Sequence, residues 1–500
     1  MKYVSTRSNF SQVNSAEAIK LGMVPSGGLF VPENIPVITE DHLTGMVGLG
    51  YKEIAREIFR LYLTDYTQAE IDECVDSAYN EVNFDHPEMA PLHRLAPNSY
   101  VLELWHGPTA AFKDMALQIM PYFLSKAIKK VGTKKETVIL VATSGDTGKA
   151  ALEGFKDVPG IKIIVFYPDH GVSKVQELQM TTTDGNNTYV VAVKGNFDDC
   201  QNAVKEIFGS KEYNAYLAGN GYELSSANSI NWGRLLPQIV YYFWAYLDLA
   251  AKGSLVFGDK INYVVPTGNF GNILAAYYAY QMGLPVHKLI CASNENKVLT
   301  DFFGTGLYNR NRDFIRTNSP SMDILISSNL ERFLFEITGH EGGLISSWLE
   351  QLSIGGEFRI DEESRCQISE ILAAGYANEA QTLKTIREVY QKYGYTVDTH
   401  TGVGLKVYND YMAVSGDQTL TVIDATANPF KFNQAVLEAI KGREAIDDKD
   451  EFTILQELSE VSKMELHSGL KELDTKSVKH TRVIQKDEIK NCVEEILGLR

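Results

Sequence analysis

The sequence contains few cysteines and no long apolar segment, and these absences exclude several classes of protein. Its five cysteines are scattered, with no Cys-x-x-Cys pair and no spacing typical of metal ligands. This pattern favours structural thiols in a reducing compartment and predicts no metal site. No run of about 18 apolar residues occurs, so we expect no membrane span. The first residues lack the apolar core of a secretory signal, and we therefore predict a cytoplasmic protein.

Positive charge is also in short supply. The chain has 47 lysines and arginines but 64 aspartates and glutamates, which gives a formal net charge of −17. An acidic chain repels nucleic acid phosphates and anionic lipid heads, so we expect neither nucleic acid nor a membrane as a partner. A small anionic substrate would need a locally cationic pocket that overcomes this field.

The order of sequence patterns predicts an α/β protein with an additional N-terminal region. Near-continuous apolar runs such as TVILVAT (137–143) and INYVVPT (261–267) are typical of parallel strands buried on both faces. They alternate with glycine-rich turns and helical patterns, which indicates an open, mostly parallel sheet. The predicted units are a mostly helical N-terminal cap region (1–98), a small α/β domain (136–225) and a large α/β domain (99–135 and 226–500).

Ligands of such sheets bind at the carboxyl ends of the strands, where a lysine motif is found. In HGPTAAFKDMALQ (106–118), Lys113 follows a strand and a turn. A lysine amine forms a Schiff base with an aldehyde, and apolar neighbours such as Phe112 favour the neutral amine that attacks. The alternative is a solvated lysine at a helix start. Pro121 falls inside the helical pattern that follows and should kink or break it.

The segment TSGDTGKA (143–150) predicts an anion site, because backbone amides converge at the start of a helix. Its spacing rejects a nucleotide-binding P-loop, since only two residues separate Gly145 from Gly148 and Ala150 follows Lys149. A carboxylate or a single phosphate is a better guest than a triphosphate. The alternative is an ordinary turn between a strand and a helix.

Two further motifs also follow apolar strands. In PTGNFGNI (266–273), Gly268 and Gly271 allow close backbone approach, so several amides could hold one phosphate. The spacing is not GxGxxG, which makes dinucleotide binding a weak reading. In IDATANPFKF (423–432), the hydroxyl of Thr426 could meet a ring nitrogen. For both segments the alternative is a turn without a ligand.

The motif NSINWGR (228–234) has side chains suited to a phosphate monoester. Asn228 and Ser229 offer neutral donors, and Arg234 offers a forked cation. The alternative is a helix N-cap followed by a surface arginine. No motif decides the function alone, but their co-occurrence in one chain is much more specific.

Together these motifs resemble threonine synthase of the long microbial type, within the fold-type II pyridoxal-phosphate (PLP) enzymes. The resemblance covers nearly the whole chain, from STRSNFSQVNSAEAIKLGMVPSGGLFVPENIP at the N-terminus through GNFDDCQ to DATANPFKF. HGPTAAFKD and TSGDTGKA together carry most of its specificity. The resemblance implies two open, mostly parallel sheets flanked by helices, plus the N-terminal mostly helical region.

The resemblance implies a role for each motif. Lys113 would carry PLP as a Schiff base and serve as the catalytic base, with Phe112 packing beside the ring. Thr426 would meet the pyridine nitrogen. The other expected contacts are the cofactor phosphate (Gly268, Asn269, Phe270, Gly271, Asn272), the substrate carboxylate (Thr143, Ser144, Gly145, Asp146, Thr147) and the substrate phosphate (Asn228, Ser229, Arg234, with Lys149 as a weaker candidate). The sequence leaves open whether Asp146 points away, pairs with a nearby cation or pairs with the substrate ammonium.

The implied reaction converts O-phospho-L-homoserine and water into L-threonine and phosphate, the last step of threonine biosynthesis, in a monomer or homodimer. The alternatives are a phospho-lyase that stops at 2-oxobutyrate, another fold-type II enzyme such as threonine dehydratase or cysteine synthase, and an inactive phosphate-binding protein. Two departures from the family pattern concern substrate positioning. Asn428 stands where the family often has histidine, and DTHTGVG (398–404) stands where it often reads DPHTAVG.

Overall fold

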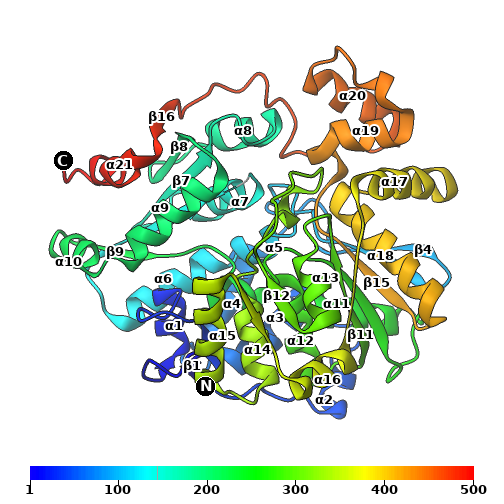
Figure 1. Ribbon diagram of the computed structural model, residues 1–500, viewed down its shortest axis with the longest axis horizontal. Helices are drawn as coiled ribbons and strands as arrows, with labels where there is room; N and C mark the ends of the chain where they lie inside the picture. Colours follow the sequence, from blue (N-terminus) through cyan, green and yellow to red (C-terminus); the bar gives the residue numbers. More distant parts are fainter. Residues whose placement is uncertain (144) are drawn as a thin grey trace.

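The computed structural model describes residues 1–143 and 145–500, and two sheets flanked by helices organise it (Figure 1). The larger sheet has six strands in the order β14-β11-β10-β15-β5-β4. It is parallel except at the edge, where β4 pairs antiparallel with β5. The strands are β4 (Leu92–Ala96), β5 (Ser99–Glu103), β10 (Ile261–Pro266), β11 (Val286–Ser293), β14 (Leu372–Tyr376) and β15 (Thr421–Ala425).

Helices cover the larger sheet, and its two central strands, β10 and β15, are buried along their whole length because both faces are covered. The helices of this unit are α3 (Tyr51–Tyr62), α4 (Gln68–Ala78), α5 (Asp114–Leu117), α6 (Met120–Val131), α11 (Trp232–Ala251), α12 (Gly271–Gln281), α13 (Val298–Thr305), α14 (Leu330–Ile337), α15 (Gly342–Gly355), α16 (Glu362–Ile371), α17 (Glu379–Tyr393), α18 (Thr399–Ser415), α19 (Asn433–Lys441) and α20 (Glu451–Ser462). A hairpin of β12 (Leu307–Asn309) and β13 (Glu357–Arg359) and the 3₁₀ turns η1 (Pro320–Met322), η2 (Pro429–Phe432) and η3 (Arg443–Ala445) complete it.

The smaller sheet is parallel throughout and has five strands in the order β16-β8-β7-β6-β9. The prediction of two mostly parallel sheets is therefore confirmed. The strands are β6 (Glu136–Ala142), β7 (Ile161–Pro168), β8 (Thr188–Lys194), β9 (Tyr222–Ser225) and β16 (Arg482–Gln485). The helices are α7 (Asp146–Phe155), α8 (Lys174–Thr181), α9 (Phe197–Gly209), α10 (Lys211–Gly219) and α21 (Ile489–Ile496), with the 3₁₀ turn η4 (Lys486–Glu488).

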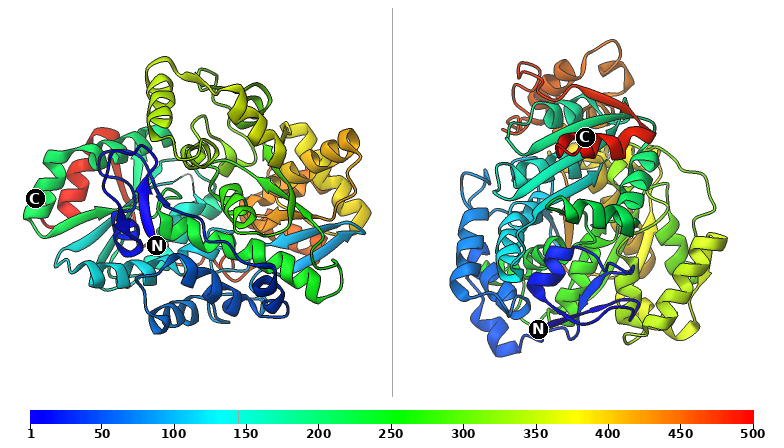
Figure 2. Two further views of the ribbon diagram at one scale, coloured as in Figure 1. Left: turned by 90° about the horizontal axis from the view of Figure 1, so that it is seen from below. Right: turned by 90° about the vertical axis from the view of Figure 1, so that its left-hand side faces the viewer.

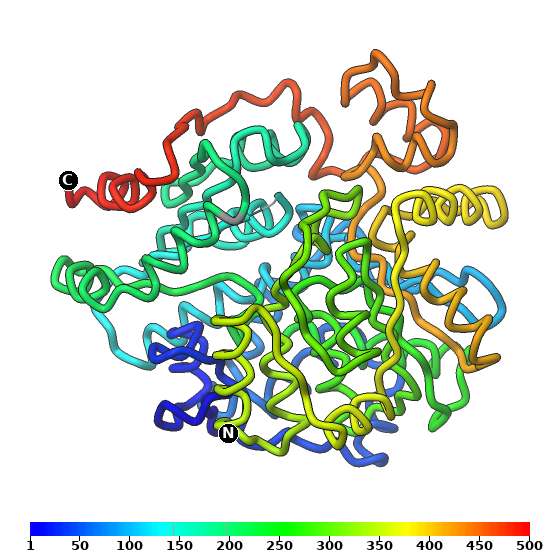
Figure 3. The backbone as a smooth tube through the Cα atoms, in the orientation of Figure 1, coloured from blue at the N-terminus to red at the C-terminus, as the bar shows by residue number. Residues whose placement is uncertain are grey.

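The C-terminal segment crosses from the larger unit to the smaller one. After α20 the chain runs across the top of the molecule and ends beside α9 and α10 (Figure 3). There β16 pairs with β8, and the buried side chains of Ile484 and Val493 join the core of the smaller sheet. This differs from the predicted assignment of all of 226–500 to the larger unit. The physical reason is that β8 would otherwise present an open edge, which β16 and α21 cover.

The N-terminal region shares its core with the larger unit. It contributes the strands β1 (Lys2–Ser5), β2 (Val13–Asn14) and β3 (Phe30–Pro32) and the helices α1 (Ser15–Leu21) and α2 (Glu40–Gly45). Its helices, blue in Figure 2, pack on the body of the molecule, and the ring centroids of Tyr3 and Trp232 are 5.4 Å apart. The predicted cap region 1–98 also contains β4, which is the edge strand of the larger sheet.

The helical pattern after Lys113 is interrupted where the sequence predicts it. Helix α5 ends at Leu117, and α6 begins at Met120 with Pro121 in its first turn. Proline is tolerated there because the first amides of a helix have no partner within the helix. Among the described residues, no helix is both long enough and apolar enough to cross a membrane.

Candidate active site

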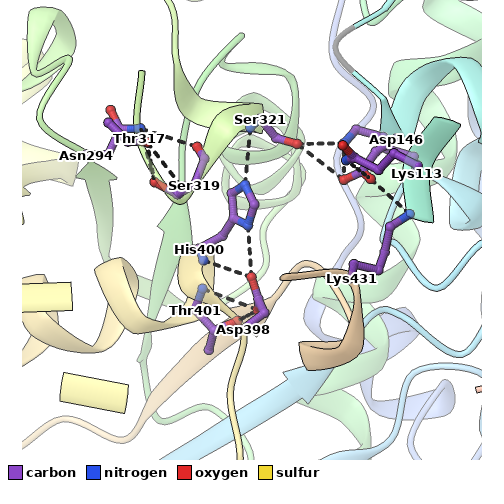
Figure 4. A network of polar contacts seen from close by, with 11 residues as sticks. Lys113, Asp146, Asn294, Thr317, Ser319, Ser321, Asp398, His400, Thr401 and Lys431 are labelled. Carbon is purple, nitrogen blue, oxygen red and sulfur yellow. Dashed lines mark hydrogen bonds and ion pairs between the residues drawn. The ribbon is translucent and has the colours of Figure 1, made fainter. Parts of the chain in front are cut away.

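Lys113 lies at the start of α5, buried with 7% of its surface exposed. Its Nζ is 3.3 Å from Asp146 Oδ2 and 3.2 Å from Ser321 Oγ (Figure 4). Burial lowers the pKa of the Lys113 amine; Asp146 opposes this shift, while the charges of Lys431 and Arg234 add to it. The environment therefore favours a neutral, nucleophilic amine more than water does.

A compact turn fixes the backbone in front of this lysine. Asp114 accepts hydrogen bonds from the amide (2.8 Å) and the hydroxyl (2.7 Å) of Thr109. A Cβ on Gly107 would lie 2.3 Å from Asp114 Cβ, so only glycine fits there. Lys431 donates to the carbonyl of Thr109 at 2.8 Å. Contacts from Asp114 and Lys431 thus fix the backbone of the HGPTAAFKD segment at Thr109, four residues before Lys113.

Asp146 pairs with two lysines, which answers the question that the sequence left open. Its Oδ1 is 2.9 Å from Lys431 Nζ and accepts from Gln176 Nε2 at 3.0 Å, while its Oδ2 faces Lys113. Despite burial, these cations hold the pKa of Asp146 well below its usual value. Lys149, the weaker candidate for the substrate phosphate, pairs instead with Glu153 at 2.7 Å and does not line the cavity described below.

In the TSGDTGKA segment, Gly145 is the N-cap of α7, which begins at Asp146. The hydroxyl of Thr143 accepts from the amides of Gly145 (3.0 Å) and Gly148 (2.9 Å), which closes the turn on itself. Gly145 has a φ of 129°, a conformation that favours glycine. Thr143 and Thr147 line the cavity, whereas Ser144 lies outside the described residues.

The segment Gly268–Asn272 leads from β10 into α12 and lines the same cavity. Phe270 has a φ of 63° at the N-terminus of this helix, which is a strained conformation for a bulky residue. A Cβ on Gly268 would lie 2.6 Å from the carbonyl oxygen of Ser321, so glycine is required by this close approach. Backbone amides at a helix N-terminus form a site for a phosphate group.

Asn272 faces inward and anchors this loop to β15. Its Nδ2 donates to Asp424 Oδ2 at 3.0 Å, and its Oδ1 accepts from Tyr241 and Tyr242. Asp424 is fully buried, and burial raises the pKa of its carboxyl to about 7. The side chain of Asn272 is thus engaged in the interior, and the loop offers its backbone to a ligand.

The buried Asp424 predicts a pH dependence of stability. Its pKa is raised on folding, so its stabilising contribution is greatest below about pH 4 and is lost as the pH rises through about 7. The loss amounts to roughly 4 kcal/mol or less. We expect Asp424→Asn to flatten the decrease in free energy of unfolding between pH 4 and 7, measured by denaturant titration. An unchanged slope in the variant would contradict a protonated Asp424.

The NSINWGR segment brings a buried cation to the cavity. Arg234, in the first turn of α11, is 5% exposed and donates to the carbonyl of Ala227 at 2.8 Å. Burial lowers the pKa of Arg234 to about 10, which leaves it charged at neutral pH. No carboxylate among the described residues forms an ion pair with it. Asn228 and Ser229 line the cavity beside it.

Thr426 follows the last residue of β15 and lines the cavity, and its carbonyl accepts from the amide of Phe112 at 2.8 Å. Asn428, one of the departures from the family pattern, does not line the cavity. Its side chain caps η2 by accepting from the amide of Phe430 at 3.0 Å. This departure therefore affects a turn and leaves the cavity lining unchanged.

Ser321 contacts Lys113 and His400 contacts Ser321, and neither residue was predicted from the sequence. Ser321 lies in η1, and its amide donates to His400 Nε2 at 3.2 Å. His400 Nδ1 is 2.9 Å from Asp398 Oδ1 (Figure 4). Because Nε2 accepts a hydrogen bond, Nδ1 carries the ring proton and donates a hydrogen bond to Asp398. The only sequence signal was DTHTGVG, which contains Asp398 and His400 at the start of α18.

All of these segments surround one cavity of about 830 Å³. Six lysines and arginines line it against two glutamates, so it is locally cationic in a net acidic chain. Most of the predicted site residues lie on its wall: Phe112, Lys113, Thr143, Thr147, Asn228, Ser229, Arg234, Gly268, Asn269, Phe270, Gly271, Asn272 and Thr426. Asp146 contacts Lys113, which lines the cavity. Gly145 lies between Thr143 and Asp146 in the chain, and its amide donates to the hydroxyl of Thr143.

Comparison with known proteins agrees with this geometry. The "Pyridoxal-phosphate dependent enzyme" family profile matches residues 85–423, between matches to "Threonine synthase N terminus" (2–79) and "Threonine synthase, C-terminal" (401–491). Threonine synthase from Pseudomonas aeruginosa is 38% identical over 88% of this chain and 90% of its own length. The chain belongs to the threonine synthase family of PLP-dependent enzymes. The resemblance predicted from the motifs is thus confirmed.

Other relatives extend the comparison. The crystal structure of PLP-bound threonine synthase from Brucella melitensis has a TM-score of 0.87 and 35% identity, and it covers 100% of this chain and 99% of that one. Threonine synthase-like 1 from Macaca fascicularis is 41% identical over 86% of this chain. The chain spans only 58% of the length of that relative.

Proposed function

We propose that this chain is a PLP-dependent lyase, a threonine synthase that converts O-phospho-L-homoserine and water into L-threonine and phosphate. The observation that carries the proposal is a pair of groups in one cavity. Lys113 is a buried amine with a lowered pKa, and Arg234 is a buried cation without a carboxylate partner among the described residues. A phosphorylated amino acid suits both groups, because its phosphate can pair with Arg234 while Lys113 acts at its α carbon. Membership of the family supports the same reaction.

The residues around the cavity fit PLP. The backbone of Gly268–Asn272 at the start of α12 suits its phosphate, Lys113 suits its aldehyde, and the hydroxyl of Thr426 suits its ring nitrogen. When bound, PLP supplies an electron sink for negative charge at the substrate α carbon. A neutral hydroxyl at the ring nitrogen favours the unprotonated pyridine, which restrains this delocalisation and limits side reactions.

Lys113 is the group that moves protons. With its pKa lowered by burial, Nζ can take a proton from the substrate α carbon and return one after water has added at the β carbon. Asp146 keeps this amine oriented from 3.3 Å, and the hydroxyl of Ser321 does so from 3.2 Å. His400 fixes the backbone amide of Ser321, which makes it a positioning residue.

Arg234, Asn228 and Ser229 bind the substrate phosphate and stabilise the charge that builds on it as it leaves. The turn from Thr143 to Thr147 holds the substrate carboxylate at the N-terminus of α7. We further propose that the enzyme is cytoplasmic, that it binds no nucleic acid and that it acts as a monomer or homodimer. The unpaired state of all five cysteines is consistent with a reducing compartment.

The proposed reaction is tested by incubating the PLP-loaded protein with O-phospho-L-homoserine in ¹⁸O-labelled water. The Cγ–O bond breaks, so the released phosphate keeps only substrate oxygens, and the new hydroxyl of threonine carries the label. Equal amounts of threonine and phosphate are expected. Release of 2-oxobutyrate without threonine would indicate the phospho-lyase alternative, and label in the phosphate would indicate simple hydrolysis and refute the proposal.

Arg234→Ala tests the assignment of the phosphate pocket. The substitution removes a charged donor to the phosphate, and kcat/KM for O-phospho-L-homoserine should fall on the order of a hundredfold. The visible absorbance of bound PLP should persist, because Arg234 serves the substrate. The matched variant Arg234→Lys keeps the charge and should lose less. Equal kcat/KM in Arg234→Ala and the unmodified protein would refute the role.

A further inference from the structure

A second buried arginine lies behind the cavity wall. Arg332, on α14, has 0% of its surface exposed. Its Nε donates to the carbonyl of Phe30 at 2.9 Å, and its Nη2 donates to that of Ile230 at 2.6 Å. Its Nη1 donates to Asn329 Oδ1 at 2.8 Å and lies 3.5 Å from the carbonyl of Ser229. One guanidinium thus ties the N-terminal region, the NSINWGR segment and the residues preceding α14.

The residues just before α14 form hydrogen bonds to the segment Gly268–Asn272, which is proposed to hold the cofactor phosphate. Asn329 donates to the carbonyl of Asn269 through both its amide and its Nδ2, each at 3.1 Å. The hydroxyl of Ser327 donates to the carbonyl of Gly268 at 2.8 Å. In a trans peptide the N–H of the next residue points the opposite way from the carbonyl. The N–H groups of Asn269 and Phe270 are therefore turned away from Ser327 and Asn329, as a phosphate cradle requires.

The charge of Arg332 has no direct counter-ion among the described residues. The neighbouring carboxylates are engaged elsewhere, Glu331 with Arg7 and Glu336 with His340. Burial lowers the pKa of Arg332 to about 10, so it stays protonated at neutral pH. Carbonyl oxygens and the Asn329 amide satisfy its donors. Such a forked group reaches acceptors on separate segments, which the point-like ammonium of a lysine does not reproduce.

We propose that Arg332 and Asn329 form one brace that holds both phosphate segments, so that the affinities for the cofactor phosphate and the substrate phosphate depend on the same buried residue. The substrate half of this inference rests on the proposed function; the cofactor half rests on the geometry of Gly268–Asn272. Arg332 does not line the cavity, so it is a positioning residue that acts through Ile230, Ser229 and Asn329.

The cofactor half is tested by titrating the apoprotein with PLP and with pyridoxal, which lacks the phosphate. The dissociation constant of pyridoxal divided by that of PLP reports the contribution of the phosphate alone. In Arg332→Met and Arg332→Lys this ratio should fall on the order of tenfold to a hundredfold. Binding of inorganic phosphate to the PLP-loaded protein, measured by calorimetry, should weaken in the same variants.

Two control variants separate a specific effect of Arg332 from a general loss of stability. Leu455→Ala in α20 removes a buried side chain outside the site and should lower stability without changing the ratio. Ser327→Ala loosens only the cofactor segment, so it should lower the ratio and leave phosphate binding intact. Equal weakening of PLP and pyridoxal in the Arg332 variants, or recovery of the ratio in Arg332→Lys, would overturn the brace.

If the Arg332 variants do not fold, Asn329→Ala decides, because it removes the bond from Nδ2 of Asn329 to the carbonyl of Asn269; an unchanged ratio in that variant overturns the proposal. If the unmodified protein makes no threonine, the proposed function fails while the PLP and pyridoxal titration still tests the brace.

Discussion

Lys113→Ala is expected to lower turnover by a factor on the order of 10⁴ or more and to abolish the visible absorbance that PLP gives when bound to lysine. The effect is large because one amine does two jobs, anchoring the cofactor and moving protons at the substrate. It lies within 3.3 Å of both Asp146 and Ser321, so it is positioned as well as buried. Absorbance spectra and a threonine assay on the purified variant measure both losses.

Chemical trapping identifies the amine directly. Borohydride reduction of the PLP-loaded protein should leave the cofactor on the peptide that contains Lys113, as read by mass spectrometry. The matched control is Lys149→Ala, because Lys149 lies in the adjacent motif but pairs with Glu153 at 2.7 Å. That variant should keep the absorbance and the label on Lys113. A label on another lysine, or a coloured Lys113→Ala protein, would remove the basis of the proposed function.

The parts of the site that were predictable share one physical feature. Lys113, Thr143, Gly268 and Thr426 each follow an apolar strand, and the carboxyl ends of parallel strands meet at one edge. Local pattern and the general rule for open sheets were therefore enough to bring them together. The break at Pro121 was predictable for a similar reason, because it depends on one residue and its own helix.

The parts that were missed depend on tertiary approach. Arg332 belongs to LERFLFEI, where an arginine next to a glutamate is typical of a solvated helix face, yet it is fully buried. Ser321 lies in an irregular segment without a motif and reaches Lys113 across 208 residues of sequence. Lys431 stood inside a quoted motif, but only the fold brings its ammonium to Asp146. No local periodicity encodes such meetings.

Asp146→Asn is expected to lower the free energy of unfolding by about 3–5 kcal/mol, the usual cost of leaving a buried charge without its partner. Lys431 has 0% of its side chain exposed and forms its ion pair with Asp146, so the substitution strands its ammonium. Lys431→Met should lower the free energy of unfolding less, because the Asp146 carboxylate keeps Lys113 as a partner. The double variant Asp146→Asn/Lys431→Met should lose less stability than the sum of the single variants, as measured by denaturant unfolding of the apoprotein.

The same two variants should shift the chemistry of Lys113 in opposite directions. Asp146 raises the pKa of the Lys113 amine and Lys431 lowers it, while burial remains the largest cause of its overall decrease. Removing Lys431 should therefore raise this pKa, and capture of PLP by the apoprotein should require a higher pH. Removing the charge of Asp146 should lower it and move capture to a lower pH. The rate of PLP capture as a function of pH measures both midpoints. Midpoints that move the same way in Asp146→Asn and Lys431→Met would show that the triad of Lys113, Asp146 and Lys431 does not set the reactivity of the amine.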